Sequence, residues 1–254
     1  MLYAMAAAAS GRLLRKNCIA GFEKPVNNKL DQLITAARLL RPLLDELVFV
    51  GGAVTGLLLT DEAAAEPRST LDVDAIAEIT MYAEYAVFGD RLRALGFSED
   101  TREDAPLCRW VNRTTTLDVM PLDEKILGFS NRWYRTAMEA SVTYQLADDL
   151  EIRVVAAPFF LATKPEAFKG RGQNDFFGSH DLEDLVTVVD GRASLIAEVR
   201  EANADLRACL RDELSSLLAS QNFQDALPGY LLPDAATQAR IPILLRRLET
   251  LASV

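Results

Sequence analysis

Two aspartates separated by one residue, Asp72 and Asp74, constrain the fold of this chain more than any other feature of its sequence. They lie within residues 71–79, where apolar and polar positions alternate closely enough to predict a β-strand. Because side chains two apart on a strand point to the same face, both carboxylates are expected to project together from one side of a sheet. Their apolar neighbours are expected to pack into the core: Leu71, Val73 and Ala75. Two parallel carboxylates repel each other unless a hard cation lies between them, so the pair predicts a site for Mg²⁺, which takes carboxylate and phosphate oxygens.

A third carboxylate, Asp118, repeats this pattern on another predicted strand. Residues 107–112 and 115–122 have the composition of two strands joined by a short polar turn, which predicts a hairpin. Leu117 and Val119 can face the core while Asp118 faces the opposite side. If this strand adjoins that of the paired aspartates, three carboxylates converge on one or two metal ions.

A double glycine, Gly51-Gly52, stands between a short β-rich run at residues 48–50 and a helix predicted at residues 53–60. Without side chains, such a turn lets backbone N–H groups and the start of the helix come close to a phosphate. The order of the features carries more information than any one of them: apolar strand, double glycine, helix, loop, paired aspartates, and a later single aspartate.

The predicted elements divide the chain into a mixed half and a helical half. Before residue 157, helices are predicted at 30–47, 53–60 and 83–95, and strands at 48–50, 71–79, 107–112, 115–122, 142–146 and 150–156. After it, only helices are predicted, at 159–169, 181–189, 195–219 and 235–252. These patterns favour an α/β (α+β) protein with a mixed β-sheet and flanking helices in residues 1–157, which include a helical lead-in. A helical domain of residues 158–254 follows, and the cleft between two such halves is a usual position for a ligand.

Charge and composition narrow the range of partners. With 27 Lys and Arg residues against 37 Asp and Glu residues, the net charge of −10 does not attract nucleic acid to the molecule as a whole. Residues 1–30 are locally basic, which indicates either a solvated helix face or a binding strip for a polyanion.

No apolar run reaches the ~20 residues that span a bilayer. The N-terminal positive charges follow the apolar stretch, whereas in a signal peptide they precede it. Three scattered cysteines indicate reduced thiols and a cytoplasmic protein without a membrane role: Cys18, Cys108 and Cys209.

Two of these segments together resemble a known family. Residues 49–52, Phe-Val-Gly-Gly, and residues 68–74, Arg-Ser-Thr-Leu-Asp-Val-Asp, resemble the first motif of the DNA polymerase β-like nucleotidyltransferase superfamily. The form Arg68-x-Thr70-x-Asp72-hydrophobic-Asp74 is similar to that of the AbiEii-type branch, which includes toxins of bacterial toxin–antitoxin and phage-defence systems.

Two later stretches extend the resemblance over roughly residues 45–190. Residues 164–171 resemble the Lys-x-x-Ala-x-x-x-Arg motif of the branch, with Lys164 and Arg171 on one helix face, where they would neutralise a triphosphate. Residues 180–184 resemble its Lys-Asp-x-x-Asp motif, which assigns Asp181 and Asp184 to the substrate site. His180 stands where the family has lysine, so a role for that position is in doubt, and the two aspartates could instead complement the helix dipole.

The resemblance implies transfer of a nucleoside monophosphate from a nucleoside triphosphate (NTP) to an acceptor hydroxyl or phosphate. Asp72, Asp74 and Asp118 would hold two Mg²⁺ ions, and Asp118 would help to deprotonate the acceptor. Gly51, Gly52 and Thr70 would contact the triphosphate.

The acceptor and the biological role stay open between several alternatives. The acceptor could be tRNA, as for a toxin that is paired with an antitoxin protein, or a small molecule, as in antibiotic-modifying enzymes of the superfamily. Two further alternatives are a phosphotransferase that uses the same site and a catalytically silent protein that binds a nucleotide or a partner.

Overall fold

The computed structural model describes residues 28–171 and 174–254. The basic stretch noted within residues 1–30 therefore lies almost wholly outside the described residues, as does Cys18.

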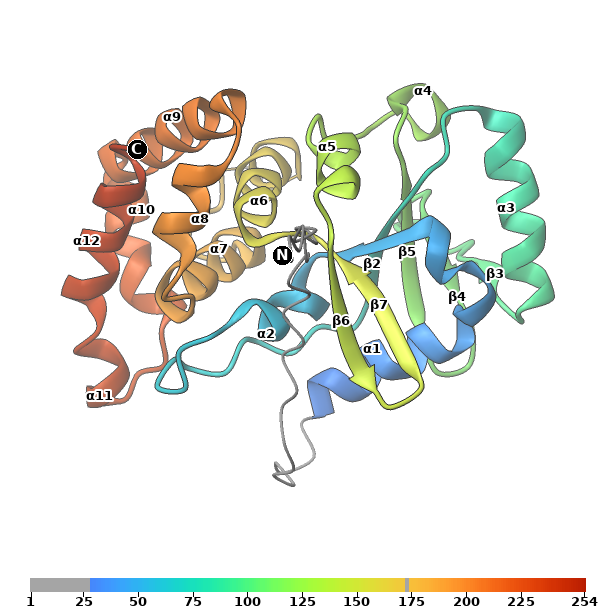
Figure 1. The fold of residues 1–254 in the computed structure, drawn as a ribbon, viewed down its shortest axis with the longest axis horizontal. Helices are drawn as coiled ribbons and strands as arrows, with labels where there is room; N and C mark the ends of the chain where they lie inside the picture. The colour runs from blue at the N-terminus through green and yellow to red at the C-terminus, as the bar shows by residue number, and fades with distance from the viewer. Residues whose placement is uncertain (1–27, 172–173) are drawn as a thin grey trace, which may run out of the picture.

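In the described part of the chain, seven strands form one mixed sheet in the order β3-β4-β5-β2-β1-β7-β6 (Figure 1). The strands are β1 (Leu47–Val50), β2 (Val73–Ala77), β3 (Ser98–Glu99), β4 (Arg109–Val111), β5 (Thr116–Pro121), β6 (Val142–Ala147) and β7 (Leu150–Val154). Strand β1 runs antiparallel to β2 and parallel to β7, whereas β2 runs parallel to β5. Consequently β1 and β7 end at the edge of the sheet where β2 and β5 begin.

The central strands β1 and β2 are apolar and almost completely buried. All four residues of β1 are buried, and β2 buries every residue except Asp74. A near-continuous apolar run is typical of a strand buried on both sides, where strict alternation is not needed. Asp74 is the exception, a half-buried carboxylate near the start of an otherwise buried apolar strand.

Helices precede, interrupt and follow the sheet. They are α1 (Asn28–Leu39), α2 (Thr55–Leu58), α3 (Tyr82–Ala94), α4 (Glu124–Leu127), α5 (Tyr134–Glu139), α6 (Ala157–Arg171), α7 (His180–Gly191), α8 (Leu195–Glu201), α9 (Ala204–Ala219), α10 (Gln221–Ala226), α11 (Ala235–Gln238) and α12 (Ile241–Leu251). Three short 3₁₀ helices are η1 (Arg41–Glu46), η2 (Gly52–Val54) and η3 (Leu227–Tyr230).

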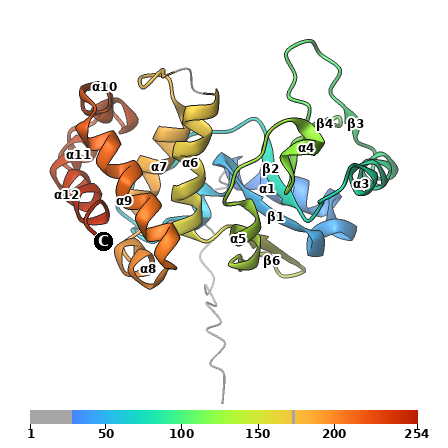
Figure 2. The same cartoon turned by 90° about the horizontal axis from the view of Figure 1, so that it is seen from above.

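The described chain after β7 is entirely helical and lies beside the sheet (Figures 1 and 2). Helix α6 packs against α7, α8 and α9, and α12 packs against α7 and α9. Only Val155 and Ala156 separate β7 from α6, and the N–H of Val155 donates to the carbonyl oxygen of Phe49 at 3.0 Å. The helical half therefore begins at the sheet edge where β1 ends and β2 begins. The α/β class, with a mixed sheet, flanking helices and a helical C-terminal half, is confirmed.

Three helices predicted as continuous are interrupted, so those predictions were wrong in extent. The helix predicted at 30–47 ends at Leu39, because Pro42 cannot donate a backbone hydrogen bond and starts the 3₁₀ helix η1 instead. The helix predicted at 195–219 breaks before α9, where Asn203 caps a new helix. The helix predicted at 235–252 breaks before Pro242, at the start of α12.

Leu71 was expected to pack into the core, and this prediction is also wrong. Its side chain is 87% exposed, whereas Val73 and Ala75 are buried as predicted. The reason is that β2 begins only at Val73, so Leu71 lies in the preceding loop and does not follow the alternation of the strand.

Within the described residues, no helix combines the length and the apolar character needed to cross a bilayer.

The break at Asn203 leads to a test of stability. The Asn203 side chain accepts a hydrogen bond from the N–H of Leu206 at 2.8 Å. Asn203→Ala removes this cap and should cost about 1 kcal/mol of unfolding free energy in urea denaturation. Asn203→Ser keeps an oxygen acceptor and should retain most of that stability; equal losses in both variants would contradict the capping role.

Candidate active site

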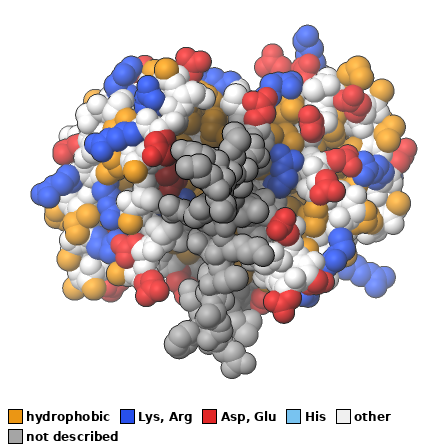
Figure 3. Space-filling model, viewed as in Figure 1, with side chains coloured by type: hydrophobic (Ala, Val, Ile, Leu, Met, Phe, Trp, Pro, Cys, Tyr) orange, Lys and Arg blue, Asp and Glu red, His pale blue; other side chains and the backbone are white. Residues whose placement is uncertain are grey.

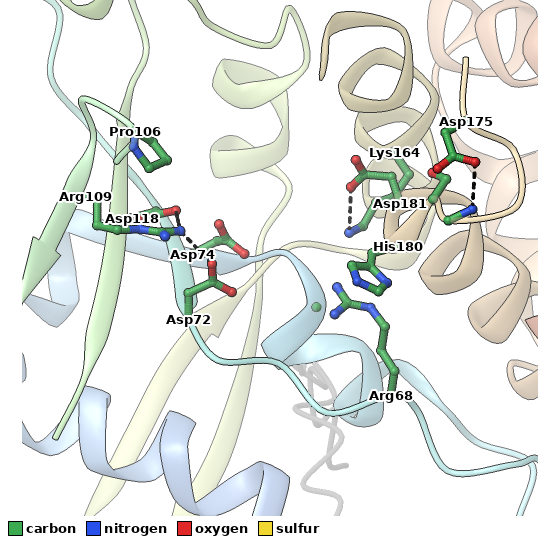
Figure 4. Close-up of a pocket in the computed structure, with 13 residues that line it drawn as sticks. Arg68, Asp72, Asp74, Pro106, Arg109, Asp118, Lys164, Asp175, His180 and Asp181 are labelled. Carbon is green, nitrogen blue, oxygen red and sulfur yellow. Dashed lines mark hydrogen bonds and ion pairs between the residues drawn. The ribbon is translucent and has the colours of Figure 1, made fainter. Parts of the chain in front are cut away.

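The three predicted carboxylates come together at one edge of the sheet. Asp74 lies opposite Asp118 in the parallel pairing of β2 with β5, and Asp72 lies just before the first residue of β2. Strands β2 and β5 are thus neighbours, which was the condition for the three carboxylates to converge. All three side chains line one cavity of about 480 Å³ between the sheet and the helical half (Figure 4).

Gly51 makes room for Asp74 at this edge. Val50 lies opposite Asp74 in the antiparallel pairing of β1 with β2, so the following turn passes beside the Asp74 carboxylate. Gly51 has φ of 72°, in the left-handed region that favours glycine, and a Cβ added there would overlap Oδ2 of Asp74. The glycine is therefore required both by the backbone angle and by the space that the carboxylate occupies.

Gly52 makes a second close approach in the same turn. A Cβ on Gly52 would lie 2.5 Å from Cγ2 of Thr70 and 2.8 Å from Nη2 of Arg68. Gly52 is buried and lines the cavity, and its lack of a side chain leaves room for Thr70 and Arg68 beside the backbone of η2. Bare backbone beside a guanidinium is an arrangement that suits a phosphate oxygen.

Arg109 is the cation nearest to the carboxylates, and the sequence analysis gave it no role. It lies opposite Asp118 in the antiparallel pairing of β4 with β5. Its Nε and Nη2 donate to the two oxygens of Asp118 at 2.8 and 2.7 Å, and Nη2 also donates to Oδ2 of Asp72 at 2.7 Å. The hydrogen bonds to Asp118 raise the pKa of Arg109 against the opposing effect of burial, so the guanidinium stays charged.

Two more cations face the carboxylates from the other side of the cavity. Nζ of Lys164, on α6, donates to Asp184 at 2.7 Å and to Asp181 at 3.3 Å. Arg68, in the loop before β2, donates from Nε and Nη2 to Asp184 at 3.0 and 3.2 Å. Burial alone would lower the pKa of Lys164, but Asp184 and Asp181 outweigh it and the pKa is raised. Lys164 is therefore a charged ammonium although its side chain is only 5% exposed.

Asp184 binds both Lys164 and Arg68 from the side away from the cavity. Its side chain is 1% exposed and does not line the cavity, whereas Asp181 and Lys164 do. The acidic residues at the start of α7 thus have two different positions: Asp181 faces the cavity, and Asp184 fixes Arg68 and Lys164 beside it.

The remaining predicted residues fall in different places. Thr70 does not line the cavity; its hydroxyl donates to the carbonyl oxygen of Asp72 at 3.1 Å and its methyl group lies beside Gly52. His180 lines the cavity with a side chain that is 71% exposed, near Glu183. Arg171 is the last residue of α6, and its side chain lies outside the described part.

A second cavity, of about 410 Å³, continues from the first and contains fewer cations. The two share Asp74, Asp118, Lys164, Asp181 and Pro106. We call the first the cationic lobe and the second the apolar lobe, since the second is lined by five apolar side chains: Val50, Met120, Phe129, Tyr134 and Ala167. Cys108 also lines the apolar lobe, and burial, together with Asp118 and Asp74, raises the pKa of its thiol to about 12, so it is neutral there.

The donor chemistry of the carboxylates fits a hard divalent cation. Three carboxylates at the start of β2 and on β5 face one cavity, and Gly51 leaves the room that the Asp74 carboxylate occupies there. As the side chains stand, no group of three or more Asp, Glu, His or Cys residues in the described ranges is close enough to hold a metal ion. Arg109 lies between Asp72 and Asp118 and forms an ion pair with each of them.

Comparisons with known proteins show similarity only at low levels. No protein-family model and no curated protein sequence matches the chain. An antigenic nucleotidyltransferase-like protein from Paracoccidioides brasiliensis matches 87% of this chain and 93% of its own with 18% identity and a TM-score of 0.47. A proposed nucleotidyltransferase from H. pylori matches 89% of this chain and 92% of its own with 14% identity and a TM-score of 0.44. Similarity at these values assigns no activity to this chain.

The close approach at Gly51 can be tested by one methyl group. Gly51→Ala should destabilise the protein by about 1–3 kcal/mol, because the backbone angle is unfavourable for alanine and Cβ displaces Asp74. Gly56→Ala is the matched control, since a Cβ there meets only Cγ of Pro67 at 3.5 Å, an ordinary contact. Urea denaturation of both variants measures the difference, and equal stabilities would contradict the assignment.

Proposed function

We propose that this protein is a Mg²⁺-dependent nucleotidyltransferase that moves a nucleoside monophosphate from an NTP to an acceptor hydroxyl or phosphate. The observation that carries the proposal is the placement of Asp72, Asp74 and Asp118 on one side of a single cavity, with Lys164 and Arg68 on the other (Figure 4). Carboxylates that bind a cation opposite buried ammonium and guanidinium groups are what a metal-bound triphosphate requires.

The cationic lobe is the place for the triphosphate. It offers the charges of Arg68, Arg109 and Lys164, and the backbone at Gly52. Ser179, which caps α7 through its side chain, also lines the lobe at the start of that twelve-residue helix. The leaving pyrophosphate carries most of the negative charge that develops, so it belongs beside these groups.

Asp72, Asp74 and Asp118 are the residues that would hold Mg²⁺. A bound Mg²⁺ pair would polarise the α-phosphate and stabilise the leaving oxygen. Asp118 lines both lobes, so its carboxylate is positioned to accept the proton of an acceptor hydroxyl as the new O–P bond forms and the bond to pyrophosphate breaks.

We further propose that the protein belongs to the AbiEii-type branch and acts as a toxin that is paired with an antitoxin. This proposal is supported by the motif residues, which contact one another across the fold: Arg68 from the first motif and Lys164 from the second share Asp184 from the third. A contact between three separate motifs is consistent with one inherited network, although each pair is also a good structural ion pair.

The apolar lobe is the place we propose for the acceptor. Attacking and leaving oxygens lie roughly in line through the transferred phosphorus, so an acceptor must approach from the side opposite the pyrophosphate. That side is the apolar lobe, where Lys164 is the one cationic side chain among the described lining residues and Glu166, Asp74, Asp118 and Asp181 are acidic. Such a lining favours a small hydroxyl compound with an apolar ring over an RNA backbone.

The face of the molecule drawn in Figure 3 carries both basic and acidic side chains. Outside the grey atoms, basic side chains are more frequent on its left side and acidic ones on its right, with acidic groups among the basic ones. RNA binding relies on clustered Lys and Arg residues that neutralise phosphates. A tRNA acceptor is therefore the second candidate, favoured by the family resemblance and by the basic residues within 1–30, which lie almost wholly outside the described part of the chain.

Binding of nucleotide tests the site. Wild-type protein should bind at least one of the four NTPs with Mg²⁺ in calorimetry, and Asp72→Asn/Asp74→Asn should weaken that binding by at least about tenfold, because it removes two charged ligands. The control is Asp90→Asn/Asp212→Asn, which removes the same charge from exposed ion pairs on α3 and α9 and should bind like wild type. Absence of NTP binding by folded wild-type protein would overturn the proposal, and release of nucleoside diphosphate instead of pyrophosphate would favour a phosphotransferase.

Narrowing the apolar lobe tests the acceptor position. Gly170 lines this lobe, and a Cβ added there meets nothing within 4 Å, so Gly170→Leu should fold normally. The variant should keep its NTP affinity and lose transfer to small hydroxyl acceptors by about tenfold or more, as expected when a side chain fills a binding pocket. Gly229→Leu, at an equally open position in η3, is the matched control. Unchanged transfer in Gly170→Leu would place the acceptor elsewhere, and transfer only to tRNA would favour the second candidate.

A further inference from the structure

Arg109 occupies the space that the carboxylates need for a metal ion. It makes three charged hydrogen bonds of 2.7–2.8 Å, two to Asp118 and one to Asp72, and its side chain is 20% exposed. Both oxygens of Asp118 and one oxygen of Asp72 are thus accepting N–H groups. The two-pronged contact with Asp118 is the strong form of an arginine–carboxylate pair.

A guanidinium and a divalent cation cannot use these oxygens at the same time. Mg²⁺ needs carboxylate oxygens at about 2.0–2.1 Å in nearly octahedral geometry, and it dehydrates reluctantly. The positive charge of Arg109 would also repel a metal ion in the same part of the cavity. A metal ion that arrives alone must therefore displace Arg109 from both carboxylates without giving it a new partner.

A nucleotide changes this balance because it brings a new partner for Arg109. Arg109 lines the cationic lobe together with Arg68 and Lys164. A triphosphate in that lobe offers several anionic oxygens to a guanidinium, which matches phosphate as well as it matches carboxylate. The energy lost at Asp72 and Asp118 is then replaced by contacts with phosphate.

We propose that Arg109 is an internal counter-ion that withholds Asp72 and Asp118 from metal until a nucleotide releases it. This inference rests on the proposed function and adds a residue and an order to it: metal and nucleotide bind as a coupled pair. Because coupling between two ligands is reciprocal, each must raise the affinity of the other. Direct coordination of the metal by phosphate couples the two ligands in any case, so the role of Arg109 is read from how its substitution changes metal binding: a purely structural Arg109 would leave Mn²⁺ affinity without nucleotide unchanged when it is replaced.

The test is binding of Mn²⁺, a probe for Mg²⁺, to the full chain with and without an NTP analogue whose α,β-bridge cannot be cleaved. In wild-type protein, the analogue should tighten Mn²⁺ binding by about tenfold or more. In Arg109→Gln, Mn²⁺ alone should bind about tenfold tighter than in wild type, and the analogue should tighten Mn²⁺ binding by a smaller factor than in wild type, because only direct coordination by phosphate remains. Arg109→Lys keeps the charge but loses the two-pronged contact, so it should lie between the two.

The matched control is Arg102→Gln. Arg102 forms a similar two-pronged pair with Asp100, in the segment between β3 and β4, and does not line the cavity. This variant should bind Mn²⁺ like wild type. Thermal melting of each variant shows that it is folded before its affinities are compared; if Arg109→Gln does not fold, the Mn²⁺ affinity of Arg109→Lys without nucleotide decides.

The outcomes separate this inference from the proposed function. If wild type binds the analogue with Mn²⁺ but binds Mn²⁺ equally well without it, Arg109 is not a counter-ion of this kind and the proposed function stands. Unchanged Mn²⁺ affinity in folded Arg109→Gln has the same meaning. If no variant binds any nucleotide, the proposed function fails, and tighter Mn²⁺ binding by Arg109→Gln would still show that Arg109 blocks the carboxylates.

Discussion

The register between three central strands determines the geometry of this protein. Backbone hydrogen bonds place Val50 of β1 beside Asp74 of β2, and Asp74 beside Asp118 of β5. A slip of one residue in either pairing would turn the acidic side chains to the other face of the sheet. Such a slip is unfavourable because it would move Asp74 and Asp118 from the cavity among the buried apolar side chains of these strands. The chemistry of the cleft is therefore a consequence of how the core packs.

Around this frame, buried charges are arranged so that each has a partner. Lys164 and Arg68 share the carboxylate of Asp184, and Arg109 joins Asp72 to Asp118. Burying one of these charges without a partner would cost free energy of folding. A buried ion pair, in turn, contributes little net stability compared with apolar residues of the same size. In the proposed function, these pairs keep the charged groups oriented before a ligand binds, and binding would exchange one partner for another.

Much of this arrangement could be predicted from the sequence, because its signals are local. The alternation around Asp72, Asp74 and Asp118, and the turn at Gly51-Gly52, depend on neighbours within a few residues, and the structure places all five on the cavity. Helix ends were less predictable, because Pro42 and Asn203 interrupt apolar patterns that otherwise continue. Arg109 was missed although its position followed from the predicted hairpin: a turn centred between residues 113 and 114 pairs position 109 with 118. The partnership of Arg68 with Asp184 joins residues far apart in the sequence, and no local pattern indicates it.

The anchoring of the loop before β2 has a consequence for synthesis of the chain. Arg240, at the start of α12, donates to Asp61 at 2.7 Å and to Asp190 at 2.8 Å, and so attaches the beginning of this loop to the helical half, as Arg68 attaches its end. Chains are made from the N-terminus, and the sheet can form before the helices are complete. The loop that carries Asp72, however, gains its full set of anchors only when Arg240 has emerged. The nascent protein should therefore possess a folded sheet well before it possesses an ordered cleft, and the cleft is among the last parts of the molecule to mature.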